Sequence, residues 1–224
     1  APASAQVTLT GQAEFGARQL FGERASAKFL EYRSIPQGLF VSHVDVELDG
    51  GESGYFLRVS ADDALEGDQS VQLRTGRLGR YELAADYDRV PHLFTNTGTS
   101  LLYAPDAPGV YTLADQIQVD LNRLYNTDID PEQAGVQRDL AALAALINGM
   151  VRPVDVSLSR ERGRIAFRYT PSPEWDLRVS YFLENERGAR PIGATFSFNT
   201  QEQLEPIDYS THEVRVDAER SGDG

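Results

Sequence analysis

The chain has 224 residues, a formal net charge of −13 at pH 7 and no cysteine. The acidic balance argues against nucleic acid as a partner, because phosphate binding depends on Lys and Arg. The lack of cysteine excludes disulfides, thiolate metal sites and covalent haem attachment within this chain. No apolar run approaches the roughly 18 to 20 residues that a membrane-spanning helix needs, so any crossing of a membrane would use strands.

The first part of the chain alternates apolar and polar residues with a period of two, which is the pattern of half-buried β-strands. The segments with this pattern are 7–20, 40–48, 55–60, 71–74 and 81–88. In the second of these segments, we place Phe40 with Val44, Val46 and Leu48 on the apolar face. Each segment predicts a strand with one apolar face and one charged face.

The alternation returns in segments 154–158, 164–169, 175–184 and 213–219, which makes eight or nine strands in all. A soluble sandwich also alternates, so the period alone does not separate the two classes. Charge of both signs lies on the polar face of nearly every strand, as in a wet barrel lumen. The longest segments, 7–20, 40–48 and 175–184, run nine to fourteen residues, the length that a tilted strand needs to cross a bilayer.

Aromatic residues recur near the strand ends, where the aromatic girdles of outer-membrane barrels lie. They are Tyr55, Tyr81, Tyr87, Tyr169, Trp175 and Tyr181. Together these features predict an all-β fold, an antiparallel transmembrane β-barrel or an open arc of a larger barrel, with residues 1–224 as a single barrel segment.

The links between the strands alternate in length. Short turns with Gly, Pro and Ser are expected at 49–53, 76–79 and 171–174. Longer links are expected at 21–38, 62–68, 91–153 and 188–209. Outer-membrane barrels have short periplasmic turns and longer outer loops. The short turns should therefore lie together at one rim and the long links at the other.

The link 91–153 carries the only helical signals of the sequence, at 113–125 and 131–149. We predict a partly helical insert that packs on itself or on the barrel mouth, with a plug or partner-binding role as the alternative. The acids Asp128, Asp130 and Glu132 lack the spacing of an EF-hand and are expected to cap helices rather than to bind Ca²⁺.

Five phrases, in this order and spacing, resemble the MtrB/PioB family of outer-membrane barrels that accompany decahaem cytochromes. The phrases are Lys28-Phe-Leu-Glu-Tyr-Arg33, Tyr87-Asp-Arg-Val-Pro-His92, Tyr169-Thr-Pro-Ser-Pro-Glu-Trp-Asp176, Arg187-Gly-Ala-Arg-Pro-Ile-Gly193 and Glu205-Pro-Ile-Asp-Tyr-Ser-Thr-His212. The resemblance covers nearly the whole chain and is weakest in 91–153. The CxxC that some members carry near the N-terminus is absent here, so any role of that motif does not carry over.

The resemblance implies a porin-like sheath in the bacterial outer membrane that houses a multihaem c-type cytochrome and supports electron transfer. It implies that the haem is carried by the partner cytochrome, that this chain has no cofactor of its own and is not an enzyme, and that the chain is an N-terminal portion of a longer barrel. The alternatives are a passive diffusion porin or transporter without a cytochrome partner, and a soluble β-sandwich binding module.

The alternation assigns side chains to two environments. The lumen-facing candidates are Arg58, Arg74, Asp86, Arg164, Arg168, Arg178 and Arg215. The lipid-facing candidates are Leu57, Val59, Leu83, Ala85, Leu177, Val179 and Val216. No catalytic, cofactor-binding or metal-binding residue is assigned. The three histidines, His43, His92 and His212, have no ligand-spaced partner and are expected to be solvated or structural.

The charge on the polar faces indicates whether these strands form a closed small barrel or an open sheet. A closed barrel of eight or nine strands has an interior filled by side chains. The polar faces carry more long Arg and Glu side chains than such an interior could pair. We therefore predict an open, curved sheet with unpaired edges at 7–20 and 211–220.

Overall fold

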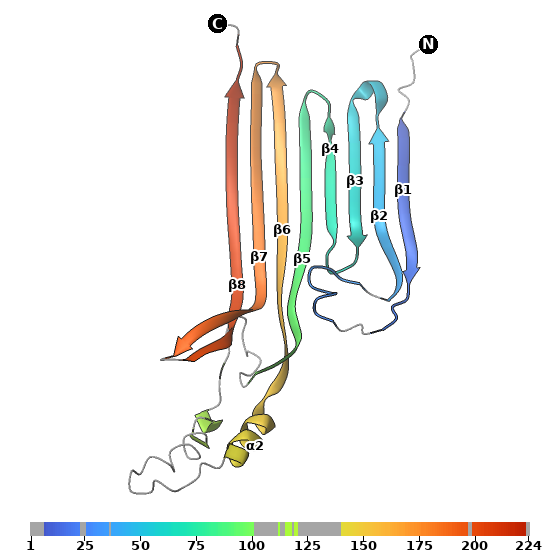
Figure 1. Cartoon of the computed structure of the whole chain (residues 1–224). Helices are drawn as coiled ribbons and strands as arrows, with labels where there is room; N and C mark the ends of the chain where they lie inside the picture. The colour runs from blue at the N-terminus through green and yellow to red at the C-terminus, as the bar shows by residue number, and fades with distance from the viewer. Residues whose placement is uncertain are drawn as a thin grey trace, which may run out of the picture.

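The computed structural model describes residues 7–22, 26–35, 37–100, 112, 115–117, 119–120, 140–196 and 199–222. The strands form one antiparallel sheet in which each strand pairs with its neighbours in chain order (Figure 1). The elements are β1 (Thr8–Arg18), β2 (Gly38–Asp49), the 3₁₀ helix η1 (Gly51–Ser53), β3 (Tyr55–Ala64), β4 (Ser70–Arg77), β5 (Tyr81–Ser100), α2 (Leu140–Met150), β6 (Arg152–Ser172), β7 (Trp175–Phe196) and β8 (Asn199–Arg220).

The short turns all lie at one end of the sheet, which we call the turn rim, at the top of Figure 1. They connect β2 to β3, β4 to β5, and β6 to β7. Gly54 and Gly79 both have a φ of +71° in these turns, a conformation that glycine adopts without a steric penalty. The longer links meet the sheet at the opposite end, the link rim. The three short turns share one rim, as predicted, and the connections that begin within 21–38, 62–68 and 91–153 share the other. The predicted long link 188–209 is wrong, because β7 continues to Phe196 and β8 begins at Asn199.

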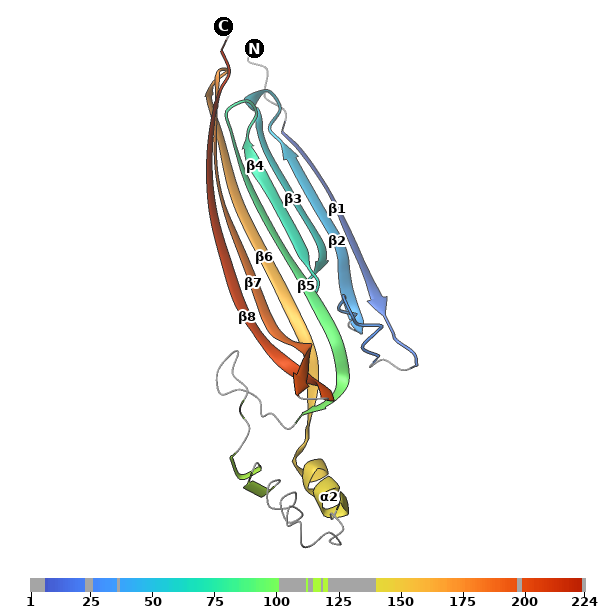
Figure 2. The ribbon, with the colours of Figure 1, turned by 60° about the vertical axis from the view of Figure 1, so that its left-hand side comes forward.

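The sheet is open. β1 pairs with β2 and β8 pairs with β7, and the described first and last strands do not pair with each other. Figure 2 shows the strands bowed along their length, as expected for an arc of a wider barrel. The predicted open arc with two unpaired edges is confirmed.

The predicted segments 154–158 and 164–169 belong to one strand, β6, so the described sheet has eight strands. Residues 160–163 interrupt the apolar alternation, and the sequence pattern therefore suggested a break. Arg160 and Arg162 nevertheless pair with both neighbours, β5 and β7. Backbone pairing continues where the alternation stops.

The predicted loop boundaries at Pro91 and Gly188 were wrong, because strands β5 to β8 continue past them. Proline lacks the N–H that a strand ladder uses, so it is rare inside a strand that pairs on both sides. Along β5, the N–H of Arg89 donates to the carbonyl of Gln69 and that of Leu93 donates to the carbonyl of Glu31. The nitrogen of Pro91, midway between them, points to the same side, away from β6, so the β5–β6 ladder loses no hydrogen bond there.

A β-bulge corrects the assignment of Phe40. Glu14 pairs with His43 and Phe15 pairs with Val41, so Ser42 is an extra residue in β2. The bulge turns Phe40 to the charged face, where its ring covers Gly16 and lies 4.3 Å from the guanidinium carbon of Arg18.

α2 lies beyond the link rim in both views (Figures 1 and 2). It confirms the C-terminal part of the predicted helix 131–149, and residues 115–117 and 119–120 of the other predicted helix are also helical. The start of the predicted helix 131–149, and the acids at 128, 130 and 132, lie outside the described residues. No helix in the described part of the chain is both long and apolar enough to cross a bilayer.

No described segment forms a second layer over most of the sheet. Among the described residues, the buried apolar side chains are Ile117, Val156, Ala189 and Ile207. Large apolar side chains on the strands stay exposed, including Val214 at 69% and Val216 at 72%. A soluble monomer rarely exposes an apolar surface of this extent, so this face requires lipid or another apolar partner.

Candidate functional site

Directly opposed residues in a sheet, and residues two apart in one strand, share a face. The strand register therefore defines two faces that run across all eight strands. One continuous row is Leu9, Leu48, Leu57, Thr75, Leu83, Phe167, Val179 and Val216. We call the surface built from this row and its parallel neighbours the apolar face.

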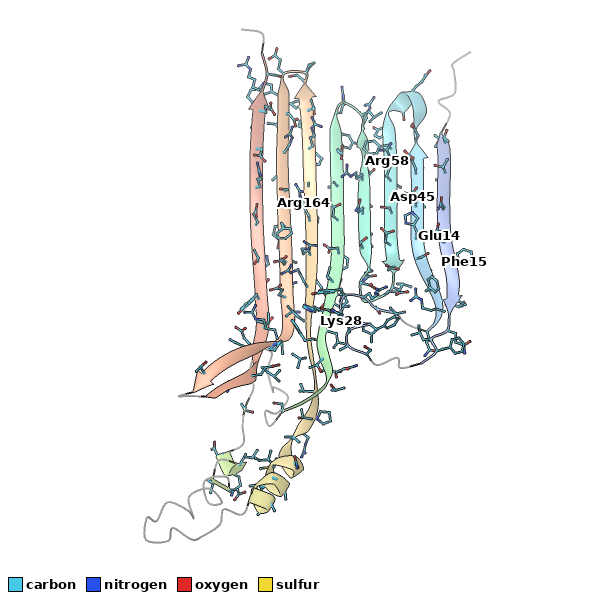
Figure 3. All side chains as sticks on the ribbon, in the orientation of Figure 1. Glu14, Phe15, Lys28, Asp45, Arg58 and Arg164 are labelled. Atoms are coloured by element: carbon cyan, nitrogen blue, oxygen red, sulfur yellow. The ribbon has the colours of Figure 1, made fainter. Side chains whose placement is uncertain are left out.

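The opposite surface, the charged face, contains a second continuous row. It is Thr10, Glu47, Arg58, Arg74, Ala84, Ala166, Ser180 and Arg215. Figure 3 labels Arg58 and Arg164 on this face, on strands separated by β4 and β5.

The strand register places each predicted set of side chains on a single face of the sheet. All seven lumen-facing candidates lie on the charged face: Arg58, Arg74, Asp86, Arg164, Arg168, Arg178 and Arg215. All seven lipid-facing candidates lie on the apolar face: Leu57, Val59, Leu83, Ala85, Leu177, Val179 and Val216. The assignment of each face to lipid or lumen stays a prediction.

Aromatic side chains border the apolar face at the turn rim. Tyr55, Tyr81 and Tyr169 are linked through the register in one row, and Trp175 lies beside the last turn. All four are exposed, as expected for side chains at the level of lipid head groups. Toward the link rim the corresponding row contains Tyr87 and Leu183. Polar pairs on the same face follow it, such as Arg89 with Glu161 at 3.5 Å.

Ion pairs between strands hold many guanidinium groups of the charged face. The Nε of Arg58 donates to Glu47 at 2.8 Å. Arg162 donates twice to Asp88, at 2.9 and 2.8 Å. Each exposed pair stabilises the fold by only about 0.2–1 kcal/mol, but together they fix the positions of the charges.

A shallow basin of about 450 Å³ lies in the charged face over strands β4 to β8. Its floor is the run of small residues Ala84, Ala166 and Ser180, which are paired in register across three strands. We define the arginine basin by this floor and by five guanidinium groups that surround it: Arg74, Arg164, Arg168, Arg178 and Arg215. The carboxylates of Glu82 and Asp217 also line it.

The five guanidinium groups of the arginine basin differ in their partners. Arg168 and Arg178 both donate to Asp176, and Arg215 donates to Asp217 on its own strand. Among the described side chains, the carboxylate nearest to Arg74 in an ion pair is that of Glu82, at 3.9 Å. Within the described residues Arg164 has no hydrogen bond or ion pair, and its side chain is exposed.

At the link rim the segment 26–35 is bound to β5. Leu93 donates its N–H to the carbonyl of Glu31 at 2.9 Å, and the rings of Tyr32 and His92 lie 4.4 Å apart. Lys28, labelled in Figure 3, forms an ion pair with Glu31. This pairing lowers the pKa of the Glu31 carboxyl and raises the pKa of the Lys28 amine.

A second group of charges at the link rim involves Glu66, which is 8% exposed. Burial raises the pKa of its carboxyl, although the guanidinium of Arg18 lies 3.8 Å away. The three histidines do not come together. The Nδ1 of His43 lies 2.7 Å from Asp62, and that of His212 lies 2.7 Å from the Tyr181 hydroxyl. No group of His, Asp and Glu within the described ranges is arranged to hold a metal ion.

Sequence reasoning identified the arginines of the basin but missed its floor. Ala84, Ala166 and Ser180 lie on three strands, and their alignment depends on a register that the alternation of one strand does not specify. A small residue flanked at two-residue spacing by arginines, as in Arg164-Ile-Ala166-Phe-Arg168, is the one local signal that the sequence carries.

Comparison with known proteins agrees with this architecture. The family model described as outer membrane beta-barrel porin, MtrB/PioB, matches residues 23–224. Outer membrane protein MtrB of Shewanella baltica (strain OS185) is 23% identical over 173 residues, which are 77% of this chain and 22% of that protein. The chain thus spans about a fifth of the length of this curated relative. These matches place the protein in the bacterial outer membrane, and the chain belongs to the MtrB/PioB family of outer-membrane β-barrel porins.

Proposed function

We propose that this chain forms part of the wall of an outer-membrane barrel that encloses a multihaem c-type cytochrome and supports electron transfer across the membrane. The apolar face contacts lipid and the charged face lines the interior. The haem belongs to the cytochrome, because this chain has no cysteine for thioether attachment or iron–sulfur ligation. The chain itself catalyses no reaction.

The dimensions of the apolar face support this orientation. On β7 it extends from the aromatic border at Trp175 to Leu183. At about 3.3 Å per residue and a tilt of roughly 40°, these residues span about 20 Å along the membrane normal, close to the roughly 25 Å apolar band of outer-membrane barrels. The opposite face has no comparable apolar band, and Arg178 and Asp217 lie at the same level on it.

The observation that carries the proposal is the continuity of the charged face across all eight strands. The interior of a small closed barrel is filled by its own side chains. Here every strand from β2 to β8 contributes charged side chains to the same face, and both edges of the described sheet are unpaired. A wide interior that holds water or a hydrophilic protein satisfies these charges.

A sheath of this kind solves a physical problem. Haems cannot approach one another through the hydrocarbon of a bilayer unless a protein-lined hole passes through it. A closed barrel satisfies its backbone hydrogen bonds between strands and can present lipid on one side and a polar lumen on the other. A cytochrome inside such a barrel can place its haems across the full thickness of the membrane.

The test uses the intact protein purified from outer membranes in mild detergent. We expect it to co-purify with a multihaem cytochrome at a fixed ratio. Liposomes that contain both proteins should transfer electrons from an external reductant to an enclosed acceptor, and liposomes with either protein alone should not. Barrel protein that lacks any cytochrome, and that conducts small ions in planar bilayers, would instead establish a passive diffusion porin.

A further inference from the structure

The arginine basin contains a guanidinium group that the described part of the chain leaves without a partner. Arg164 lies directly opposite Asp86 on β5 and Phe182 on β7. Asp86 faces the same side but forms no ion pair with Arg164 among the described residues. A guanidinium presents five N–H donors and no acceptor, so Arg164 has its full donor capacity free for a ligand.

The floor of the basin gives a ligand access to this group. Ala84, Ala166 and Ser180 have the smallest side chains of their row, and longer side chains rise on every side of them. Arg164 is exposed and lines the same basin, so a group that occupies the basin can contact its guanidinium.

The charge of the basin selects the kind of ligand. Five guanidinium groups and two carboxylates, Glu82 and Asp217, line the basin, whereas the chain as a whole has a net charge of −13. Asp176 and Asp217 already pair with Arg168, Arg178 and Arg215, so the positive charge available to an anionic ligand is that of Arg164, with Arg74 beside it.

The neighbouring site at Asp176 shows the geometry that a carboxylate adopts on this face. Arg168 donates to both Asp176 oxygens, with Nη2 at 2.7 Å from Oδ2 and Nε at 3.0 Å from Oδ1, and Arg178 donates to the same group. Two guanidinium forks therefore converge on one planar carboxylate, which is the geometry that arginine recognises best.

We infer that the arginine basin is a docking site for a carboxylate of the protein enclosed by the barrel, held by Arg164 with Arg74 beside it. The carboxylate belongs either to an acidic side chain of the cytochrome or to a haem propionate. This inference rests on the proposed function. It adds a defined contact point on the inner wall, on the strands β4 to β8.

The composition of the chain allows a direct test, because Lys28 is its only lysine. An Arg164→Lys substitution keeps the positive charge and places a single amine in the basin. Treatment of the intact complex with a water-soluble carbodiimide then joins that amine to a carboxylate in contact with it. We expect a covalent species at the summed mass of barrel and cytochrome, formed through residue 164.

Mass spectrometry of the cross-linked peptides separates the two sources of the carboxylate. A bond to an Asp or Glu side chain identifies an acidic side chain, and a bond to a haem-bearing peptide through the porphyrin identifies a propionate. Either product supports the inference. The matched control is Arg58→Lys, which lies on the same face outside the basin and is already paired with Glu47. It should cross-link to Glu47 within the barrel.

The negative outcomes are also distinct. If the Arg164→Lys complex retains its cytochrome but the new amine joins only Asp86 or Glu82 of the same chain, the docking site is wrong and the sheath function stands. If the unaltered protein contains no cytochrome at all, the sheath function fails, and the docking site fails with it.

Discussion

Strands β5 to β8 each have one part with an apolar face and one part that is polar on both faces. The contrast shows that lipid constrains the side chains, whereas the sheet requires only backbone pairing. Between Trp175 and Leu183, β7 alternates apolar side chains with charged or polar ones, apart from Phe182 on the charged face. Beyond Leu183 the strand still pairs with β8, residue for residue, as far as Phe196. As far as Gly188 the side chains of β7 are polar on both faces, with Asn185 and Arg187 on the side where Val179 and Tyr181 lie.

We call the part of β5 to β8 beyond the level of Leu183 the extension, and the part before it the spanning region. The extension has the polar side chains of a water-exposed antiparallel ribbon. Arg187 pairs with Asp208 at 3.1 Å on one face, and Arg160 donates to Glu186 at 2.8 Å on the other. Backbone pairing is continuous across the boundary, and only the side chains change. We expect this change to mark the level at which the sheet leaves the membrane, on the side of the link rim.

The largest effect is expected when a charge is placed on β7 on either side of Leu183, where we place the boundary between the spanning region and the extension. Val179→Arg puts a guanidinium on the apolar face near mid-membrane, and should reduce the free energy of unfolding by about 2 to 4 kcal/mol. Asn185→Arg lies further along the same face of the same strand, and should cost about 1 kcal/mol or less. The measurement is urea-induced unfolding of the intact protein in lipid vesicles.

A second control is Gln72→Arg, which lies on the charged face of β4. It should resemble Asn185→Arg because its guanidinium reaches water. Equal losses for the substitutions at 179 and 72 would mean that the two faces have been assigned to the wrong environments. Equal losses at 179 and 185 would mean that the boundary is misplaced.

A smaller effect is expected where the extension depends on backbone geometry. Gly188 has a φ of +137°, and a Cβ added there would lie 2.1 Å from the carbonyl oxygen of Ser157. Gly188→Ala should therefore cost roughly 1 to 3 kcal/mol through strain. Gly163→Ala is the matched control inside the spanning region, because its Cβ would meet no atom within 4 Å. Urea unfolding should show little change for the control; a change as large as at 188 would remove the strain argument.

Ion pairs should contribute less than either effect. Asp88 accepts two hydrogen bonds from Arg162 in the row that contains Glu184, and Asp208 accepts one from Arg187 further along the extension. We expect Asp88→Asn and Asp208→Asn each to cost about 0.2 to 1 kcal/mol, with the two-hydrogen-bond pair at the upper end. Both losses should shrink in 1 M salt because of screening. Salt-independent losses would show that burial, rather than charge, matters at these positions.

The amino-acid sequence predicts the spanning region better than the extension, for a physical reason. On β5, Leu83 and Ala85 lie on one face and Glu82 and Asp86 on the other, because one face must be apolar in lipid, and a period of two reflects that requirement. At Arg89 and Pro91 both faces meet water, so no period remains and the strand has no signature in the sequence. Only the strand pairing in the structure, such as Ser159 opposite Pro91, identifies the extension as part of the sheet.

The arginine basin was predictable in part for the same reason. Arg164 and Arg178 follow the period of their own strands, and both were assigned to the charged face. Their proximity to each other depends on the β6–β7 register, which the turn at 173–174 sets. The bulge at Ser42 had no sequence signal either, and it reversed the face of Phe40. Long-range register is the information that a single sequence lacked.

The smallest expected effect concerns the attachment of segment 26–35 to the extension of β5. The ion pair with Lys28 lowers the pKa of Glu31 below its ordinary value of 4.5. A lowered pKa means that the charged form is favoured in the folded protein. Its contribution is therefore complete above pH 4.5 and is lost as the pH falls through the lower folded value. We expect the Leu93 amide, which donates to the Glu31 carbonyl, to lose protection from hydrogen exchange over that range.

His92 also faces Glu31, with Nε2 3.7 Å from Oε1, and Tyr32 stacks on His92, so the pH response has more than one source. Lys28→Gln isolates the part that belongs to the Lys28–Glu31 pair, because it leaves His92 and Tyr32 in place. In this variant the Leu93 amide should begin to lose protection at a higher pH, since the pKa of Glu31 is no longer held down by the amine. An amide deep in the spanning sheet, such as that of Val179, should not respond to the substitution. Exchange at Leu93 that follows the same pH curve with and without Lys28 would show that the pair does not hold this segment on the extension.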